Sequence, residues 1–319
     1  MNYIEERIQD LENYKPHLTL SPQEIDAFWD PLIAECKKKP LEIKKTKVKT
    51  PHPFVEVYDI TYKAYDDTCI HGWYIVPGFI PAKGLPGILH IPGYAWGRGY
   101  PEQYFQWVLM GMAVLAIDVR GQGGETGNNL PQTSGMTKGW LTQGILDKET
   151  SYYKAISIDT YRALDCLLMQ EEIDPNRVCV GGSSQGGGLT LMTLALHQGA
   201  AAGIADVPNM CHMDLGVFRS NSSLGEIADY VKRFPNTYEQ VMETLAYFDI
   251  MNLGHRIKTP VILSAGLKDS VCLPETIYAA YHRIAGPKEI HVYPFQGHGV
   301  SFQHSRKTID FIRPYILEK

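Results

Sequence analysis

The feature that most constrains this chain lies at residues 177–190, where an apolar run passes into the pattern Gly-x-Ser-x-Gly and then into a helix-like stretch. A backbone that turns this sharply from strand to helix needs small residues on both sides of the serine, and Gly182 and Gly186 stand there. The pattern predicts that Ser184 projects from a strained turn at a helix N-terminus, where N–H groups and the helix dipole favour negative charge. A purely structural glycine-rich turn is the alternative.

Short apolar runs alternate with longer helical patterns over the second half of the chain and define its fold class. The predicted strands are 87–91, 113–119, 177–181, 203–207, 261–265 and 289–293. The predicted helices are 103–111, 151–172, 186–197, 275–284 and 305–317. Strands that are apolar throughout and separated by helices predict an α/β fold with a mainly parallel sheet covered on both faces.

The first half of the chain and one insertion depart from this alternation. The first 30 residues have a helical, amphipathic pattern with a helix start at 21–24, and 58–62 and 70–76 form a hairpin pattern around Asp66 and Asp67. Residues 210–253 separate two strands and are too long for a simple crossover. We predict one domain, 1–319, with an N-terminal extension at 1–50 and a cap-like helical insertion at about 210–253; an ordinary surface excursion is the alternative for the insertion.

Composition excludes several classes of protein. The 319 residues are 44% hydrophobic and 20% charged, as in ordinary globular proteins, and the net charge of -5 disfavours nucleic acid as the main partner. The local exception is Lys37–Lys49, which holds seven lysines. We interpret this stretch as a solvated surface segment, with a docking patch for an anionic polymer or membrane as the alternative.

Cysteine usage and hydropathy bear on the compartment. The six cysteines are scattered without a Cys-x-x-Cys pair or zinc spacing, and Cys179 lies in an apolar run typical of a buried reduced thiol. No apolar run approaches the roughly 18 residues of a membrane helix, and residues 1–30 lack an apolar signal core. The expectation is a cytoplasmic protein with no membrane association and no metal.

A serine nucleophile needs a base, and in a fold of this kind the acid and the histidine follow the serine on loops after later strands. Asp269 follows the strand 261–265, and His298 follows the strand 289–293 on a glycine-flanked loop. His291 lies within a strand and His304 near the start of the last helix, so His298 is the predicted base. It accepts the Ser184 proton and passes it to the leaving alcohol, while Asp269 orients the imidazole.

The oxyanion of such a reaction is stabilised by two backbone N–H groups. One belongs to the residue after the nucleophile, Gln185. The other comes from the loop after an early strand; Pro92 has no N–H and Gly93 permits a tight turn, so Tyr94 is the candidate. The side chains of Tyr94 and Trp96 are predicted either to wall a small acyl pocket or simply to pack. These features predict an α/β-hydrolase fold and a serine carboxylesterase.

Several short strings together resemble the acetyl xylan esterase and cephalosporin-C deacetylase family, which is family 7 of the carbohydrate esterases. The most specific is Arg-Gly-Gln at 120–122 combined with Gly-x-Ser-Gln-Gly. The strings lie at 90–94, 118–124, 182–187, 266–269 and 297–298.

The resemblance implies removal of acetyl groups from small acetylated sugars, xylo-oligosaccharides and the cephalosporin side chain. It implies a triad of Ser184, Asp269 and His298, with Tyr94 and Gln185 as oxyanion donors. It assigns structural support of the site to Arg120 and Gln122. It also implies a homo-oligomer, a hexamer of paired trimers, with neither metal nor organic cofactor.

Two positions depart from the family pattern. Gly299 stands where the family commonly has a glutamate after the catalytic histidine, so Arg120 is expected to lack its usual acidic partner and to pair elsewhere. The shortened loop predicts that His298 is more mobile than the neighbouring strands. After Pro208, where this chain has Asn209 and Met210, the family more often has larger apolar residues, which predicts a reshaped substrate pocket around Pro208.

Two other functions are weighed against the esterase. A peptidase or acylase of the same fold uses the same triad, although a chain without a propeller or second large domain disfavours the oligopeptidase type. A non-catalytic binding protein of this fold typically lacks a triad residue, whereas Ser184, Asp269 and His298 are all present.

Overall fold

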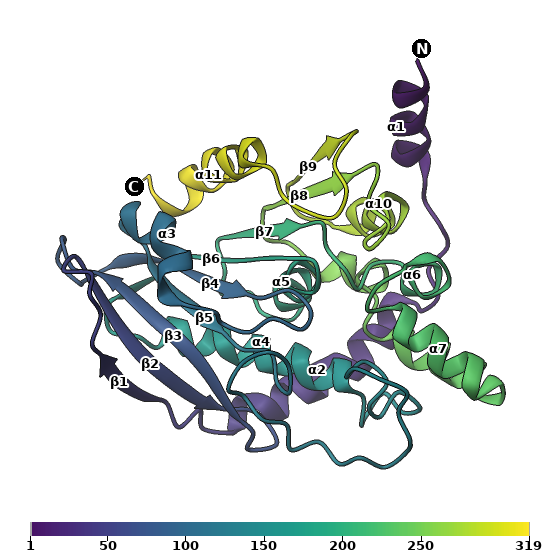
Figure 1. Cartoon of the computed structure of the whole chain (residues 1–319), viewed down its shortest axis with the longest axis horizontal. Coiled ribbons are helices and arrows are strands. Elements are labelled where there is room, and N and C mark those ends of the chain that lie inside the picture. Colours follow the sequence, from purple (N-terminus) through teal and green to yellow (C-terminus); the bar gives the residue numbers. More distant parts are fainter. Residues whose placement is uncertain (1, 319) are drawn as a thin grey trace.

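The computed structural model describes residues 2–318 and centres on a nine-stranded sheet (Figure 1). The order across the sheet is β1-β2-β3-β5-β4-β6-β7-β8-β9. The strands are β1 (Lys44–Val48), β2 (Val55–Lys63), β3 (Cys69–Pro77), β4 (Leu85–Ile91), β5 (Ala113–Ile117), β6 (Ile173–Ser183), β7 (Ala202–Asp206), β8 (Val261–Gly266) and β9 (Lys288–Tyr293).

Strand direction confirms the mainly parallel sheet. Strands β5, β4, β6, β7, β8 and β9 are parallel neighbours, whereas β1, β2 and β3 are antiparallel and β3 joins β5 in antiparallel pairing. The reason lies in the connections, because parallel neighbours need a crossover of a dozen or more residues and the helices supply it. The predicted hairpin turn at Asp66 and Asp67 connects β2 to β3.

Helices cover both faces of the sheet. They are α1 (Tyr3–Asn13), α2 (Pro22–Lys38), α3 (Phe105–Leu109), α4 (Tyr152–Leu168), α5 (Gln185–Leu196), α6 (Met213–Arg219), α7 (Gly225–Arg233), α8 (Tyr238–Ala246), α9 (Ile250–Leu253), α10 (Pro274–Arg283) and α11 (Phe302–Ile316). Short 3-10 helices span Pro101–Tyr104, Pro235–Thr237 and Gly254–Arg256.

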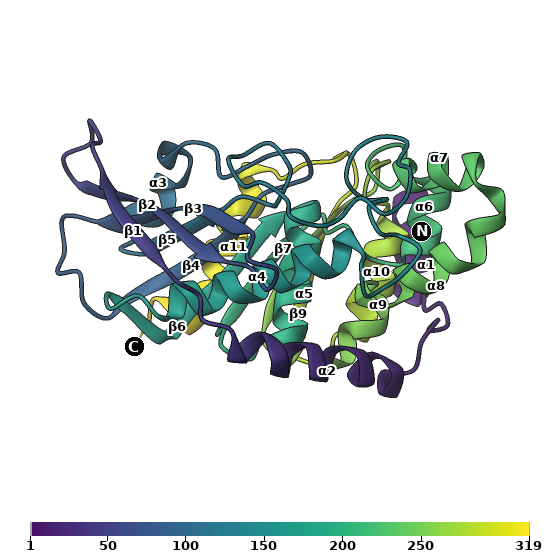
Figure 2. The same ribbon diagram turned by 90° about the horizontal axis from the view of Figure 1, so that it is seen from below.

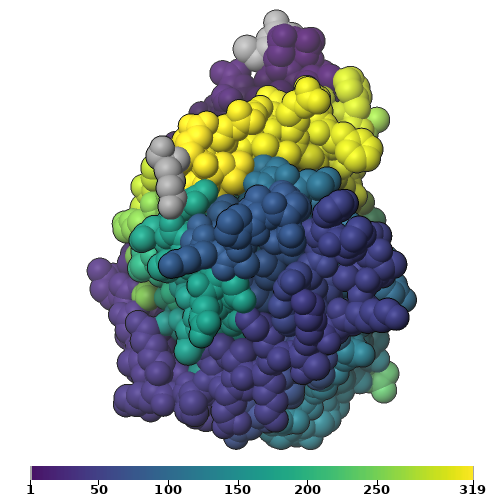
Figure 3. Space-filling model, turned by 90° about the vertical axis from the view of Figure 1, so that its left-hand side faces the viewer, coloured from purple at the N-terminus to yellow at the C-terminus, as the bar shows by residue number. Residues whose placement is uncertain are grey.

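Two apolar cores result, one on each side of the sheet. Ile88 of β4 belongs to the core formed with α3 and α11, whereas its neighbour Leu89 belongs to the larger core formed with α2, α4 and α5. Successive side chains of a strand point to opposite faces of the sheet, so an apolar run such as Ile88-Leu89 contributes one side chain to each core. Figure 3 shows the C-terminal helix α11 (yellow) lying beside the blue segment that contains α3, and Ile312 and Trp107 share that core.

The N-terminal extension contains the two helices that its pattern predicts, and one strand that it does not. Helix α2 begins at the predicted cap, where the Ser21 side chain accepts from the Glu24 N–H and the Glu24 carboxylate accepts from the Ser21 N–H. Strand β1 falls inside the lysine-rich stretch, for which the sequence pattern indicates no strand. It is an exposed edge strand whose Lys45 and Lys47 pair with Glu172 and Glu56. Such charged edges resist pairing with other chains.

The insertion between β7 and β8 folds into helices α6 to α9, as the pattern indicates. Figure 2 shows α6, α7 and α8 gathered at the end of the molecule opposite β1, near α1 and α10. Within residues 2–318, none of the helices combines the length and the apolar character needed to cross a bilayer.

A histidine at the end of β4 gives the fold a testable acid sensitivity. Burial lowers the pKa of His90 to about 4, and its buried Nδ1 has no hydrogen-bond partner among the described residues. The unfolded chain binds a proton near pH 6.5 while the folded chain does not until about pH 4, so stability is lost as the pH falls through this window.

We therefore expect His90→Phe to flatten the acid limb of the stability profile. Between pH 7 and pH 4, urea unfolding should show the wild type losing up to about 3 kcal/mol more free energy of unfolding than the variant, at about 1.36 kcal/mol per pKa unit. Parallel profiles for the two proteins would contradict a depressed His90 pKa.

Candidate active site

The turn at Ser184 has the geometry that the sequence predicts. Ser184 adopts φ 60° and ψ -121° between the end of β6 and the start of α5 at Gln185. A Cβ at Gly182 would lie 2.5 Å from the Ile91 carbonyl oxygen, and one at Gly186 would lie 2.1 Å from the same atom. Both positions therefore require glycine, because the end of β4 passes directly against the turn.

The structure brings the three predicted catalytic side chains into one hydrogen-bonded chain. His298 Nε2 lies 3.0 Å from Ser184 Oγ, and His298 Nδ1 lies 2.9 Å from Asp269 Oδ2. The other oxygen of Asp269 accepts from the backbone N–H groups of Val271 at 2.8 Å and Cys272 at 2.9 Å. The buried carboxylate is thus fixed in orientation, with one oxygen held by the backbone and one facing the imidazole.

The His298 loop is held more firmly than the departure at Gly299 predicts. Hydrogen bonds to both ring nitrogens count against the expected looseness of His298. The loop also rests on the end of β8, since the Lys268 N–H donates to the Gln296 carbonyl at 3.0 Å. A Cβ at Gly266 would lie 2.5 Å from that same carbonyl oxygen, so the glycine lets the two loops meet.

The two other histidines considered as bases have different partners. His304 is fully buried and binds Asp206 Oδ1 at 2.7 Å and the Tyr293 hydroxyl at 2.9 Å, while His291 pairs with Glu289. His304 therefore ties the start of α11 to the end of β7.

The predicted oxyanion residues lie on either side of the turn. A Cβ at Gly93 would be 3.9 Å from the Ser184 Cβ, which places the loop carrying Tyr94 against the nucleophile. Gln185 is the first residue of α5, where backbone N–H groups have no partner inside the helix. Gln122 connects the two sides, because its Oε1 accepts from the Ala95 N–H at 2.7 Å and its Nε2 donates to Gln185 Oε1 at 3.0 Å.

Arg120 does pair elsewhere, with two acidic residues. Its fully buried guanidinium contacts Asp159 of α4 at 2.6 and 2.7 Å and Asp66 of the hairpin turn at 2.6 and 3.0 Å. Burial alone would raise the pKa of Asp66, but the hydrogen bonds from Arg120 hold it below its usual value. The missing glutamate at position 299 therefore leaves no unpaired buried charge.

The predicted pocket residues lie in different places. Trp96 is 71% exposed and lines a groove of about 690 Å³ together with Pro92 and Gly93 of the same loop, whereas Pro208 is buried against Gly187. For Cys272, which the sequence did not single out, burial raises the pKa of the thiol, and the neighbouring side chains of Ser184 and Asn209 partly oppose that rise. Its signal was only its place three residues after Asp269.

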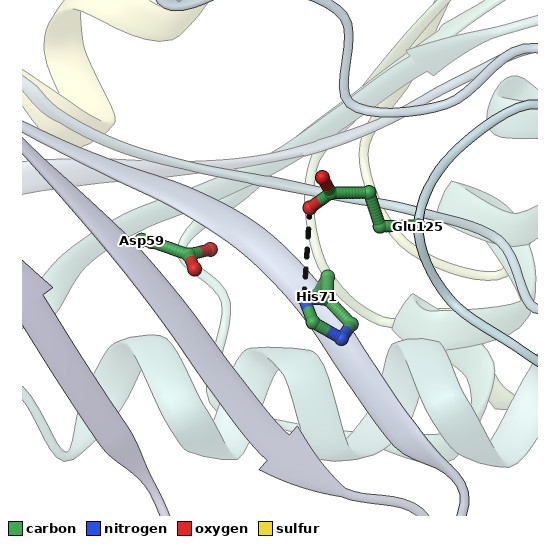
Figure 4. A group of neighbouring side chains, drawn as sticks. All are labelled: Asp59, His71 and Glu125. Carbon is green, nitrogen blue, oxygen red and sulfur yellow. Dashed lines mark ion pairs between the residues drawn. The ribbon is translucent and has the colours of Figure 1, made fainter. Parts of the chain in front are cut away.

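One cluster has the composition of a metal site. Oxygen and nitrogen atoms of Asp59, His71 and Glu125 lie within 4.8 Å of one another (Figure 4). The Arg98 guanidinium already occupies this cluster, with Nη1 2.6 Å from Asp59 and Nη2 hydrogen-bonded to Glu125. It also stacks on the Trp73 ring at 3.9 Å. A fixed cation thus pairs with both carboxylates and occupies the space between them, so the residues present do not fit a metal ion.

A mainly parallel sheet with a serine on a strand-to-helix turn, facing a histidine and an aspartate from later loops, defines an α/β-hydrolase. The model of the acetyl xylan esterase family (AXE1) matches residues 1–314. The chain belongs to the acetyl xylan esterase family and is a hydrolase of the esterase class.

Solved structures agree with the family. The chain superposes on the acetyl xylan esterase from Paenibacillus sp. R4 with a TM-score of 0.93 and 39% identity, covering 97% of this chain and 99% of that one. The chain superposes on acetyl xylan esterase 1 from Thermoanaerobacterium sp. JW/SL YS485 with a TM-score of 0.90 and 29% identity. This match covers 96% of this chain and 98% of that one.

A curated relative is longer than this chain. The acetyl esterase Axe7A from Xylanibacter ruminicola is 29% identical over 294 residues, which are 90% of this chain. The chain spans 65% of the length of that protein.

The buried pairing of Arg120 predicts a large stability effect. Arg120→Met leaves two carboxylates without their counter-ion, and breaking a buried pair from one side costs about 3–5 kcal/mol. Urea unfolding should therefore show a drop of that size in the free energy of unfolding. Arg313→Met is the control, because Arg313 is about half exposed and 3.8 Å from Asp310, so its loss should cost under about 1 kcal/mol. Equal effects of the two substitutions would contradict this role of Arg120.

Proposed function

We propose that this protein is a serine acetylesterase acting through Ser184, His298 and Asp269. The observation that carries the proposal is the hydrogen-bonded chain from Asp269 through His298 to Ser184 Oγ. Membership of the acetyl xylan esterase family supports the acetyl preference. Acetylated xylo-oligosaccharides, other small acetylated sugars and cephalosporin C are the proposed substrates.

Acylation begins when Ser184 Oγ attacks the acetyl carbonyl carbon and its proton passes to His298 Nε2. For this transfer the neutral imidazole carries its own proton on Nδ1, facing Asp269, which stabilises the imidazolium that forms. The bond from carbon to the leaving alcohol oxygen then breaks, and His298 returns the proton to that oxygen. Acetyl-Ser184 and a free sugar hydroxyl result.

Deacylation repeats these steps with water. His298 accepts a water proton as the oxygen attacks the acetyl carbon, acetate leaves, and the proton returns to Ser184 Oγ. In both halves the carbonyl oxygen becomes negative, and the backbone N–H groups of Tyr94 and Gln185 are the proposed donors to it. The start of α5 adds the favourable end of the helix dipole.

The side chains beside Ser184 support a short acyl group. Cys272 and Asn209 are both buried, and the side chains of Ser184 and Asn209 lie near enough to the Cys272 thiol to oppose the rise in its pKa that burial causes. The Asn209 N–H also donates to the Ser184 carbonyl at 2.9 Å, which fixes this wall to the nucleophile. A rigid wall so close to Oγ favours acetyl over longer acyl chains.

Hydrolysis of aryl acetate, aryl butyrate and an aryl acetamide tests the proposal. We expect acetate to be cleaved fastest, and Ser184→Ala or His298→Ala to lower kcat by about 10⁴- to 10⁶-fold with the fold retained. Thr193→Ala provides a control, because this hydroxyl on α5 only donates to the Leu189 carbonyl. Acetate release that survives Ser184→Ala would contradict the proposal, and faster amide cleavage would favour a peptidase or acylase. Cephalosporin C and acetylated xylo-oligosaccharides then distinguish the substrates.

We further propose that the protein is a homo-oligomer, a hexamer by family resemblance, located in the cytoplasm. Two large apolar side chains on either side of His298 in the sequence are exposed to solvent. Phe295 is 76% exposed and Phe302 is 96% exposed. Exposed apolar groups of this kind are typical of interaction surfaces. The six free cysteines support a reducing compartment.

The assembly is tested by light scattering after gel filtration. A hexamer gives about six times the chain mass of 35.9 kDa. A single species at the mass of one chain, at micromolar protein concentration, would contradict the proposed assembly.

A further inference from the structure

The side chain of Tyr94 ends on a carboxylate of the insertion. Its hydroxyl donates to Glu226 Oε2 at 2.7 Å and accepts from the Trp140 N–H at 3.3 Å. The Tyr94 and Trp140 rings meet edge to face at 5.4 Å. Glu226 lies in the first turn of α7. The loop that carries Tyr94, the segment that carries Trp140 and helix α7 therefore meet at this carboxylate, although they are distant in sequence.

The surroundings of Glu226 are built to hold its carboxylate in place. Glu226 is 9% exposed, and the Leu141 backbone lies near its carboxylate and opposes the rise in its pKa. Gly139 adopts φ +63°, and a Cβ there would lie 1.9 Å from Glu226 Oε2, so the loop wraps the carboxylate more closely than any other residue allows. Burial raises the pKa of Glu226, while the Tyr94 hydrogen bond opposes that rise. A buried carboxylate with no role in the core is costly to keep.

The oxyanion loop is thus fixed from two sides. Beyond Tyr94, the Ala95 residue has φ +64° and its N–H donates to Gln122. At Tyr94 itself, the phenol anchors the residue to Glu226. The Tyr94 N–H belongs to the residue anchored in this way, and its direction decides whether it reaches the oxyanion.

We propose that Glu226 is a positioning residue: by holding the Tyr94 phenol, it sets the direction of the Tyr94 N–H in the oxyanion hole and joins the insertion to the catalytic machinery. This inference rests on the proposed function, since it assigns the oxyanion donor to Tyr94. It gives the insertion a part in the chemistry in addition to any part in covering the site.

The role predicts a specific kinetic signature. Removing one oxyanion donor costs about 10²- to 10³-fold in kcat, so a donor that remains but is misdirected should cost about 10- to 100-fold. We expect Glu226→Ala and Tyr94→Phe each to lower kcat by that factor with KM changed less than about threefold. Glu226→Gln keeps an acceptor for the phenol and should retain activity within about threefold of wild type.

Two further readouts separate positioning from a general loss of structure. The double variant Glu226→Ala/Tyr94→Phe should be no slower than the slower single variant, because both break one hydrogen bond. Methyl trifluoromethyl ketone, whose carbonyl carbon the serine attacks to give an oxyanion, should bind each variant more weakly by the same factor that kcat falls. The matched control is Asp229→Ala on the same helix, whose carboxylate pairs with Lys138 at the surface, 2.9 Å away. It should stay within about twofold of wild type.

The outcomes are distinct. A Glu226→Ala protein as active as Asp229→Ala would overturn the inference, as would additive losses in the double variant or unchanged ketone binding. If Glu226→Ala does not fold, the kcat and the ketone affinity of Tyr94→Phe test the inference by themselves. An unchanged kcat of Tyr94→Phe would then overturn it. Wild-type acetate release that does not depend on Ser184 would instead refute the proposed function, and that baseline is measured first.

Discussion

The site depends on the close passage of the end of β4 against the turn at Ser184. The Ile91 carbonyl oxygen occupies the space that a Cβ of Gly182 or Gly186 would fill. Because the chain continues from Ile91 through Pro92 and Gly93 to Tyr94, the same contact that allows the turn also delivers the proposed oxyanion loop to the nucleophile. A side chain at either glycine would separate the two loops and disturb both parts together.

Buried polar groups then fix the loops that this contact brings together. Gln122 bridges the loop after β4 to the start of α5, and the Tyr152 hydroxyl, which receives a hydrogen bond from Gln122, donates to the Arg120 carbonyl. Arg120 in turn joins Asp66 of the N-terminal hairpin to Asp159 of α4. Such networks stabilise only when every member has its partner. The hairpin of β2 and β3 is remote from Ser184 in sequence, yet through Asp66 it belongs to the network that holds the loops around the nucleophile.

Prediction from sequence succeeded for the parts of the fold that have a local pattern. The strands β4 to β9 and the helices that connect them follow from hydrophobic periodicity. The proposed roles of Ser184, Asp269 and His298 rest on chain order, and the structure places their side chains within hydrogen-bond distance. Strand β1 was missed because its exposed lysines lack the alternation that marks a half-buried strand. The departure at Gly299 predicts a loose His298, whereas contacts of Gln296 with Gly266 and Lys268, which lie far from it in the sequence, hold the loop.

The sequence by itself determined the fold class and the three residues of the proposed triad, because periodicity and order along the chain are local properties. Only the tertiary structure decided the partners of the buried charges. Asp66 had the pattern of a turn residue and Glu226 that of a surface helix, yet one pairs with Arg120 and the other holds Tyr94. The physical reason is that a charge has no preferred partner in the sequence, whereas burial leaves it only the few groups that folding places within hydrogen-bond distance.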